Sequence, residues 1–236
     1  MRLYRFLDEF GGLQTIESGK LKVSRLADLN DPFEWWLGID GIVQEGKAFA
    51  EYQSGKFVEG RNEHHGLLCF SGTAKESVLW SHYADRHRGM VLEIEVTDDP
   101  DKLIKVDYSD DRPCMDLTRW TTEKQDYGFP LINQLIRRKS CGWAYENEYR
   151  LYLSLAGCEI ARGLYFRRLN TGMLHRLIIG WKSRIEISYV QRLLNQSGYK
   201  DCKVARAHPQ DRSYLIAYDG DDEIPVSGSI RLGDDN

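Results

Sequence analysis

Two carboxylates and a guanidinium alternate along one short stretch of the sequence. Glu146, Glu148 and Arg150 stand two residues apart among aromatic and β-favouring neighbours, and this alternation predicts a strand over residues 146–153. Side chains two apart on a strand share a face, about 7 Å from each other. One carboxylate could fix a substrate hydroxyl while the other stabilises a developing positive charge, with Arg150 keeping one of them ionised. The same row is also typical of a solvated strand face with cross-strand ion pairs.

Two hydroxyls follow an apolar run earlier in the chain. Residues 66–71 are predicted to form a buried strand, and Ser71 and Thr73 stand where that strand ends. Both hydroxyls are candidate ligand contacts. No Gly-x-Ser-x-Gly motif surrounds Ser71, so a serine hydrolase has little support.

A helix is predicted after this strand, over residues 76–86. Trp80, Tyr83 and His87 recur at spacings of three and four residues, which places them on one helix face. One interpretation is an aromatic stripe that packs in the core and ends in a capped histidine. The other is that this face meets the end of the Ser71 strand, so that Tyr83 and His87 reach a ligand.

A turn is predicted at Asn30-Asp31-Pro32, because proline restricts the residue before it and Asx side chains bond nearby backbone amides. Asn30 and Asp31 would then lie at the rim of a pocket, with an aromatic residue of the following Phe33–Trp36 segment as a wall. The alternative is a helix N-cap with a hydrophobic start.

An amphipathic helix is predicted over residues 131–140. It ends in Arg137, Arg138 and Lys139, whose charges suit the dipole at the carboxyl end of a helix. These cations come just before the acidic row, which is entered past Trp143. They could hold an anionic ligand, but pairing with the carboxylates is the simpler interpretation.

The composition argues against several classes of function. The formal charge of −4 is not a basic signature for nucleic-acid binding. The five cysteines form no Cys-x-x-Cys pair, so neither a zinc site nor a disulfide framework is indicated, and a cytoplasmic location is expected. His64 and His65 have no third ligand at a suitable spacing, so no metal is expected. The sequence also contains no signal-peptide core, membrane-spanning run, Gly-x-Gly-x-x-Gly motif or Walker loop.

The order of the predicted elements indicates an α+β protein with a mixed, mostly antiparallel sheet and flanking helices. One domain is expected over residues 1–218, and the acidic, glycine-rich residues 219–236 are typical of a flexible tail. Residues 109–130 are expected to be loop with a helical piece, and Glu93 and Glu95 to point outward. The remaining predicted elements are strands at 3–6, 21–24, 90–96, 103–108, 163–169, 177–181, 202–207 and 212–218, and helices at 13–18 and 187–195.

Several short motifs, taken in order, resemble those of an uncharacterised bacterial family, the domain of unknown function 2971 family. The motifs are Leu3-Tyr4-Arg5-Phe6, Asn30-Asp31-Pro32-Phe33-Glu34, Cys69-Phe70-Ser71, Trp80-Ser81-His82-Tyr83-Ala84 with His87 and Gly89, and Lys139 with Trp143 and Glu146-Asn147-Glu148-Tyr149-Arg150. Each motif is weak alone, but the set covers most of the chain. The family name itself carries no activity.

A second, more distant resemblance is to the ADP-ribosyltransferases. Their signature is an arginine on the first strand, Ser-x-Thr at the end of a middle strand and Glu-x-Glu on a later strand. In this sequence Arg5, Ser71 with Thr73, and the Glu146–Glu148 segment follow that order, although Tyr4 could face the pocket in place of Arg5. The resemblance implies a split, ADP-ribosyltransferase-like sheet with NAD⁺ as substrate. One departure is that the acidic pair is predicted inside a strand and not on a loop.

The resemblance also implies roles in cofactor binding. NAD⁺ would lie between two halves of the sheet, where Arg5 bonds a phosphate. Ser71 would orient the nicotinamide ribose or support Glu148. Tyr83 or Trp80 would stack on the nicotinamide.

The chemistry it implies rests on the two glutamates. Glu148 would bond the ribose 2′-hydroxyl and stabilise the oxocarbenium-like centre as nicotinamide leaves. Glu146 would position or deprotonate the acceptor. The acceptor is left open between a protein, a nucleic acid and a small molecule, and a bacterial defence or toxin system is a possible setting.

Two other functions remain open. The first is a non-enzymatic module of a defence system that binds a nucleotide or nucleic acid in the same cleft. The second is a metal-dependent nuclease, although the acid-x-Lys spacing typical of such sites is missing. Its candidate residues would be Asp31, Glu146, Glu148 and Lys139.

Overall fold

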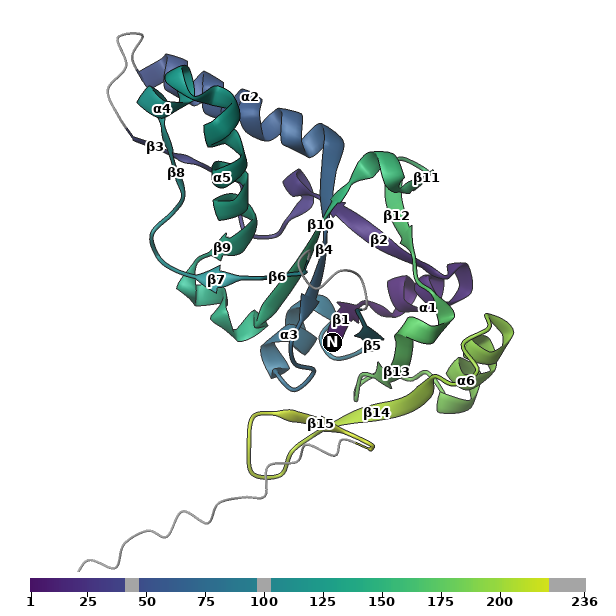
Figure 1. Cartoon of the computed structure of the whole chain (residues 1–236). Coiled ribbons are helices and arrows are strands. Elements are labelled where there is room, and N and C mark those ends of the chain that lie inside the picture. Colours follow the sequence, from purple (N-terminus) through teal and green to yellow (C-terminus); the bar gives the residue numbers. More distant parts are fainter. Residues whose placement is uncertain (41–46, 97–102, 221–236) are drawn as a thin grey trace, which may run out of the picture.

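A large mixed β-sheet forms the centre of the protein (Figure 1). The computed structural model describes residues 1–40, 47–96 and 103–220. The strands of the sheet are β1 (Arg2–Leu7), β2 (Lys20–Arg25), β4 (His65–Ser71), β5 (Met90–Glu95), β6 (Leu103–Lys105), β10 (Glu148–Ser154), β11 (Glu159–Ala161), β12 (Leu164–Arg168), β13 (Leu174–Ile179), β14 (Lys203–Pro209) and β15 (Ile216–Tyr218).

The main path of the sheet runs in the order β11-β12-β2-β4-β1-β5-β13-β14-β15, and β10 and β6 continue it from β4. The pair β13–β14 is parallel, whereas the other pairs described for this sheet are antiparallel. The strands at its three ends, β6, β11 and β15, are three residues long each. The predicted α+β class with a mixed, mostly antiparallel sheet is therefore confirmed.

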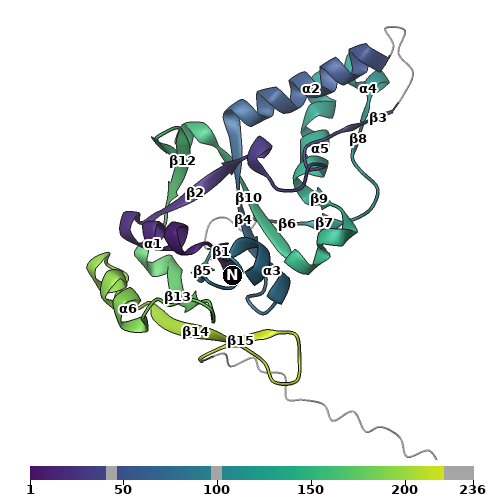
Figure 2. The ribbon, with the colours of Figure 1, turned by 180° about the vertical axis from the view of Figure 1, so that it is seen from behind.

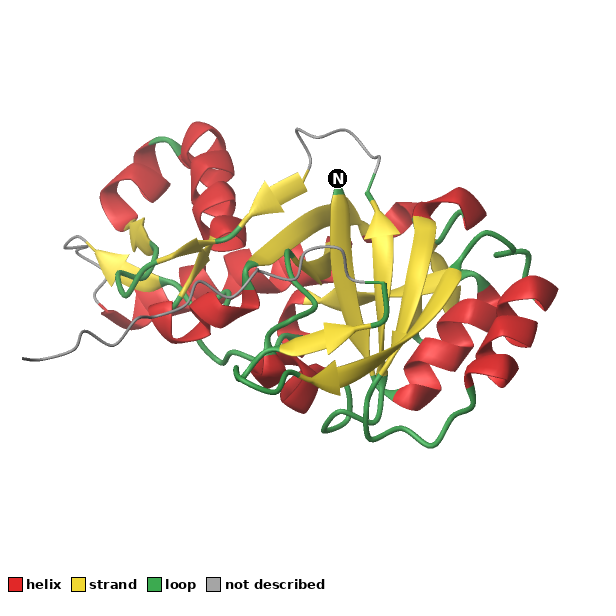
Figure 3. Cartoon of the chain, turned by 90° about the horizontal axis from the view of Figure 1, so that it is seen from below, coloured by secondary structure: helices red, strands yellow, loops and turns green. Residues whose placement is uncertain are grey.

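The helices lie in groups around this sheet. α1 and α6 pack together at one end, while α2, α4 and α5 gather at the other, and Figures 1 and 2 show this from opposite sides. Figure 3 shows the strands lying between the two groups. The helices are α1 (Glu9–Ser18), α2 (Lys47–His64), α3 (Ser77–Tyr83), α4 (Leu117–Thr122), α5 (Lys124–Arg137) and α6 (Ile187–Gln196); short strand pairs are β3 (Gly38–Asp40) with β8 (Cys114–Asp116) and β7 (Asp107–Tyr108) with β9 (Arg138–Lys139).

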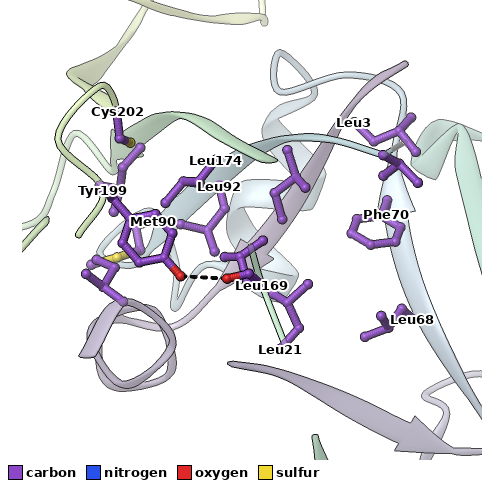
Figure 4. Close-up of a cluster of buried hydrophobic side chains, with 14 of the residues drawn as sticks. Leu3, Leu21, Leu68, Phe70, Met90, Leu92, Leu169, Leu174, Tyr199 and Cys202 are labelled. Atoms are coloured by element: carbon purple, nitrogen blue, oxygen red, sulfur yellow. Dashed lines mark hydrogen bonds between the residues drawn. The ribbon is translucent and has the colours of Figure 1, made fainter. Parts of the chain in front are cut away.

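The largest core cluster lies between the sheet and the α1–α6 pair (Figure 4). Leu3, Met90 and Leu92 from the strands are fully buried there with Ile16 of α1. Burying a side chain of this kind contributes about 1.5–3 kcal/mol. The Tyr199 hydroxyl donates to the carbonyl oxygen of Leu169 at 3.0 Å, so its polar atom is satisfied inside this core. A second cluster joins α2, α4 and α5.

Several predicted boundaries were wrong. α3 ends at Tyr83, and residues 85–87 then take left-handed backbone conformations. Residues 109–130 contain β8, α4 and the first half of α5, which continues through Pro130 and ends at Arg137, so that Arg138 and Lys139 belong to β9 and not to the predicted helix. Glu93, expected to point outward, is 3% exposed. Residues 221–236, most of the predicted tail, lie outside the described residues, and the single-domain prediction stays a prediction.

Along one edge of β4 the sheet forks. β1 pairs with β4 at Tyr4 and Ser71, near the end of β4, whereas β2 pairs with it near its start. Between these two points the Arg5 guanidinium donates to the carbonyl oxygen of Cys69 at 2.5 Å and to that of Lys22 at 3.3 Å. The side chain thus supplies donors where the diverging strands no longer do.

The close approach of two turns gives a stability prediction. A Cβ added at Gly180 would lie 2.2 Å from the carbonyl oxygen of His87, so Gly180→Ala forces the backbones apart. We expect this variant to lower the free energy of unfolding by about 1–3 kcal/mol or more, measured by urea denaturation. Gly157→Ala is the matched control, because an added Cβ meets nothing within 4 Å there. Equal stability of the two variants would contradict the prediction.

Within the described part of the chain, no helix combines the length and the apolar character needed to cross a membrane.

Candidate functional site

A cavity of about 210 Å³ opens at the fork of the sheet. Its walls come from β1, β2 and β4, from the segment after β2, from α3 and from the region between β9 and β10. Segments far apart in the sequence therefore meet in one hollow. The predicted site residues that line it are Tyr4, Arg5, Asn30, Ser71, Tyr83, Lys139, Glu146 and Glu148.

Strand register brings three of these residues into one row. Ser71 of β4 pairs with Tyr4 of β1 on one side and with Glu148 of β10 on the other. Residues paired across antiparallel strands point to the same face, so all three side chains reach one side of the sheet. The Ser71 hydroxyl donates to the carbonyl oxygen of Glu146 at 2.7 Å, so it also fixes the backbone of the acidic segment.

The acidic pair does not lie along a single strand, as its alternation predicted. Glu146 is the last residue of a 3-10 helix, η3 (Cys141–Glu146), and β10 begins only at Glu148. Asn147 between them has a φ of 42°, a left-handed conformation that asparagine tolerates. The Gly72 amide donates to the Asn147 carbonyl at 2.8 Å, which ties this turn to the end of β4.

The solvated-face interpretation of this row is wrong. Glu146 and Glu148 are each 5% exposed, and Arg150 is fully buried. Arg150 binds Glu148 with two parallel bonds of 2.8 Å, from Nε to Oε1 and from Nη2 to Oε2. Burial alone would raise the pKa of Glu148, but Arg150 and Lys139 outweigh it and bring that pKa to about 2. Glu148 is therefore ionised at neutral pH.

Lys139 is enclosed by three carboxylates. Its ammonium lies 2.7 Å from Glu146, 2.9 Å from Glu34 and 3.4 Å from Glu148. It also stands 4.8 Å from the ring centre of Trp143. Burial opposes the charge, but Glu148 and Glu34 raise the pKa of Lys139 above its usual value. Lys139 is thus a fixed cation and not a nucleophilic amine.

Glu146 occupies a different environment from Glu148. Burial raises its pKa, and the bonds from Lys139 and Tyr83 only partly oppose this. The Tyr83 hydroxyl donates to Glu146 Oε1 at 2.6 Å and accepts a hydrogen bond from the exposed amide of Asn30. A short chain of hydrogen bonds therefore leads from exposed Asn30 through Tyr83 to Glu146, the carboxyl group whose pKa is raised.

Sequence reasoning missed Glu34 as a site residue. Its side chain is 2% exposed and bridges the two cations, 2.9 Å from Lys139 and 2.8 Å from Arg150. The next residue, Trp35, has a φ of 61°, which is rare for a bulky side chain and typical of functional segments. A signal was present, because Glu34 belongs to the Asn30-Asp31-Pro32-Phe33-Glu34 motif, but the local pattern of that motif predicts only a turn.

Some predicted site residues do not reach the cavity. Trp80 is fully buried, with its Nε1 donating to the Ala74 carbonyl at 2.6 Å, which agrees with the core-stripe interpretation. His87 lies beyond the end of α3, 6.4 Å from the ring centre of Trp80. Thr73 Oγ1 accepts from the Lys75 amide at 3.1 Å and caps its own turn. These residues support the fold around the site.

The other pocket residues surround the cavity without lining it. Asp31 Oδ1 accepts from the Phe33 amide at 2.9 Å and lines a neighbouring hollow. Trp143 packs against Lys139, and Arg150 lies behind Glu148. Among the described residues, no group of three or more His, Cys, Asp or Glu side chains is arranged to hold a metal ion. The Lys139 ammonium lies between the carboxylates of Glu34, Glu146 and Glu148.

The arrangement combines three chemical capacities. Glu148 supplies a permanent negative charge, Glu146 can exchange a proton, and Arg5 presents a half-buried guanidinium at the fork. Water-poor sites that fix charges in this way stabilise charged transition states. Comparisons with protein-family models, with curated proteins and with solved structures found no match for this chain.

Proposed function

We propose that this chain transfers ADP-ribose from NAD⁺ to an acceptor, as an ADP-ribosyltransferase-like enzyme. The observation that carries the proposal is the convergence of Arg5, Ser71, Glu146 and Glu148 on one cavity at the fork of the sheet. These residues come from three distant segments of the chain, and they follow one another in the sequence as the signature does. The opposite pKa shifts of the two glutamates add support, because such separation is typical of residues with different roles in catalysis.

Glu148 stabilises the charge that develops at the sugar in this proposal. The bond between the ribose C1′ and the nicotinamide nitrogen breaks, and its electron pair stays on that nitrogen and neutralises the leaving group. The positive charge left on the sugar is oxocarbenium-like, and an ionised carboxylate nearby lowers its energy. Glu148 is suited to this because its pKa of about 2 keeps it ionised.

Glu146 accepts the proton that the acceptor loses as it bonds to C1′. Its raised pKa makes it a stronger base than an ordinary carboxylate. Tyr83 holds one oxygen and Lys139 the other, so the carboxyl group is fixed in direction. Tyr83 then acts through its hydroxyl on Glu146, in place of the stacking role that the resemblance implied.

The cavity is too small to enclose the whole NAD⁺ molecule. About 210 Å³ is below the 300–1,000 Å³ that is usual for pockets that enclose a drug-sized ligand, so the nicotinamide ribose end enters and the rest lies outside. Arg5 uses two of its five N–H donors on main-chain carbonyls. The others can bond a phosphate at the cavity mouth.

The proposal is tested with NAD⁺ labelled on its adenylate phosphate. We expect purified protein, incubated with label and cell extract, to release nicotinamide and to move label into a protein, nucleic-acid or small-molecule fraction. Glu148→Gln should abolish this turnover, while Glu59→Gln on the exposed face of α2 should retain it. Full turnover by Glu148→Gln would rule out the role given to Glu148.

A second candidate function is nucleotide binding without turnover. It is favoured by one observation, the engagement of both Glu148 oxygens by Arg150, which compensates much of the carboxylate charge. In that case NAD⁺ at a hundred times its Kd would stabilise the fold by about 2.7 kcal/mol, with no nicotinamide released. The labelling experiment and a thermal melt together separate the two functions.

A further inference from the structure

A second hollow, of about 220 Å³, lies next to the cavity. Glu34 and Lys139 line both, so their ion pair is the partition between the two spaces. The second hollow is bordered by the strand-free segment from Ser109 to Pro113 and by the end of β9. The proposed transfer chemistry uses none of the side chains that face only this side.

An exposed aromatic ring and a guanidinium line this hollow, those of Phe33 and Arg112, and the exposed ring of Trp36 packs beside them. Phe33 and Trp36 are 53% and 58% exposed, and their rings lie 6.0 Å apart with planes inclined by 21°. The Arg112 guanidinium carbon lies 5.6 Å from the ring centre of Phe33 and 5.7 Å from that of Trp36. We call Phe33, Trp36 and Arg112 the aromatic platform. Packing among its members explains their mutual order, and Phe33 and Trp36 both remain exposed to solvent.

The remaining walls of the hollow carry polar groups. Ser109, Asp110, Asp111 and Arg138 line it together with Phe33 and Arg112. Carboxylate and hydroxyl oxygens accept hydrogen bonds from amino groups, and a guanidinium donates to ring nitrogens and carbonyl oxygens. A flat ring bordered by both donors and acceptors would therefore satisfy the platform and the walls together.

We propose that the aromatic platform binds the base of a nucleotide. Bases stack on aromatic side chains and on arginine planes, and their edges carry both amino donors and ring acceptors. The volume suits one ring system and not a whole dinucleotide. Asp110 and Asp111 disfavour the dense phosphates of a nucleic-acid strand, so the ligand is a single nucleotide. This site does not depend on turnover of NAD⁺.

The base can come from two sources. It is either the adenine of a dinucleotide whose other end enters the first cavity, or the base of a separate nucleotide. The Glu34–Lys139 ion pair separates the two hollows, so one dinucleotide could place its two ends in both of them. The two sources differ in whether NAD⁺ itself contacts the platform.

Calorimetric titration with AMP, NAD⁺ and nicotinamide mononucleotide tests the proposal. We expect AMP to bind, and Phe33→Ala to weaken AMP binding by roughly 5- to 150-fold, the effect of losing one stacking partner. Arg112→Lys keeps the charge but loses the plane, so it should also weaken AMP binding. Tyr214→Ala, at a residue that is 95% exposed and does not line this hollow, is the control and should leave AMP affinity unchanged. Circular dichroism and a thermal melt check that each variant folds.

The other ligands identify the source of the base. If Phe33→Ala weakens NAD⁺ as well as AMP but not nicotinamide mononucleotide, the base is the adenine of the dinucleotide. If it weakens AMP alone, the base belongs to a separate nucleotide. Absence of AMP binding to the wild-type protein, or wild-type AMP affinity in Phe33→Ala, overturns the proposal. A single-stranded oligonucleotide that binds through the platform more tightly than AMP overturns the assignment to a single nucleotide.

Discussion

Replacing Arg150 by leucine is expected to lower the free energy of unfolding by about 3–5 kcal/mol at pH 7, because it leaves two buried carboxylates without their main partner. Arg150 is fully buried and binds Glu148 through two bonds and Glu34 through a third contact. Lys139 alone cannot compensate three carboxylates. Urea denaturation of wild type and variant measures the difference.

The pH dependence of this loss has a definite sign. In the wild type the pKa of Glu148 is lowered to about 2, so its stabilising contribution is complete above the ordinary value of 4.5 and is lost as pH falls toward 2. Without Arg150, burial raises the pKa of Glu148, and the folded variant takes up a proton more readily than the unfolded chain. The stability gap between variant and wild type should therefore narrow from pH 7 to pH 5.

Arg88→Leu is the control for this prediction. Arg88 forms an exposed ion pair with Asp85, and pairs of that kind contribute little. Its stability should stay close to that of the wild type at both pH values. A gap for Arg150→Leu that is equally small, or that widens as the pH falls, would contradict the account of the buried charges.

Glu146→Gln is expected to reduce NAD⁺ turnover by about 10²- to 10⁴-fold, the usual contribution of a general base. Glu146 works as a base only when ionised, so wild-type turnover should fall as the pH drops through its raised pKa. Tyr83→Phe removes a hydrogen bond that favours the ionised form, which raises this pKa further. The acid limb of the rate profile should then move to higher pH.

The readout of this experiment is nicotinamide release measured across pH. Lys139 and Glu148 also face Glu146, and both remain in Tyr83→Phe, so the shift reports the lost hydroxyl. Asn30→Asp is avoided because it would add a charge beside the chain of hydrogen bonds. An unchanged acid limb in Tyr83→Phe, with reduced turnover, would show that Tyr83 acts on substrate and not on Glu146.

The strands of this fold could be predicted because their apolar runs are local signals. β4 and β5 are buried almost throughout, β13 is buried over residues 177–179, and α6 places Val190 and Leu194 on one buried face four residues apart. α5 was harder to predict, because Pro130 lies inside it and proline usually marks a break. Its packing against α4 and the second core cluster outweighs that local preference.

The candidate site likewise contains parts that sequence signals indicate and parts that depend on tertiary contacts. Register between β1, β4 and β10 gathers Tyr4, Ser71 and Glu148, whereas Arg5 reaches the same cavity through the fork between β2 and β4. The turn at Asn147 could not be predicted, and Glu34, although it belongs to a motif, could not be assigned its two cation partners. Both depend on contacts with residues far along the chain, Gly72 for the turn and Lys139 for Glu34, and no local pattern encodes such contacts.

Within residues 1–40, 47–96 and 103–220, the strands at the ends of the sheet are three residues long each, which limits pairing with a strand of another chain. A foreign strand laid beside β6, β11 or β15 would gain only a few main-chain hydrogen bonds, too few to hold it in place. End strands this short also offer few main-chain groups for the strand stacking that forms fibrils. We therefore expect another macromolecule to be recognised at these end strands through side-chain contacts and not through main-chain pairing.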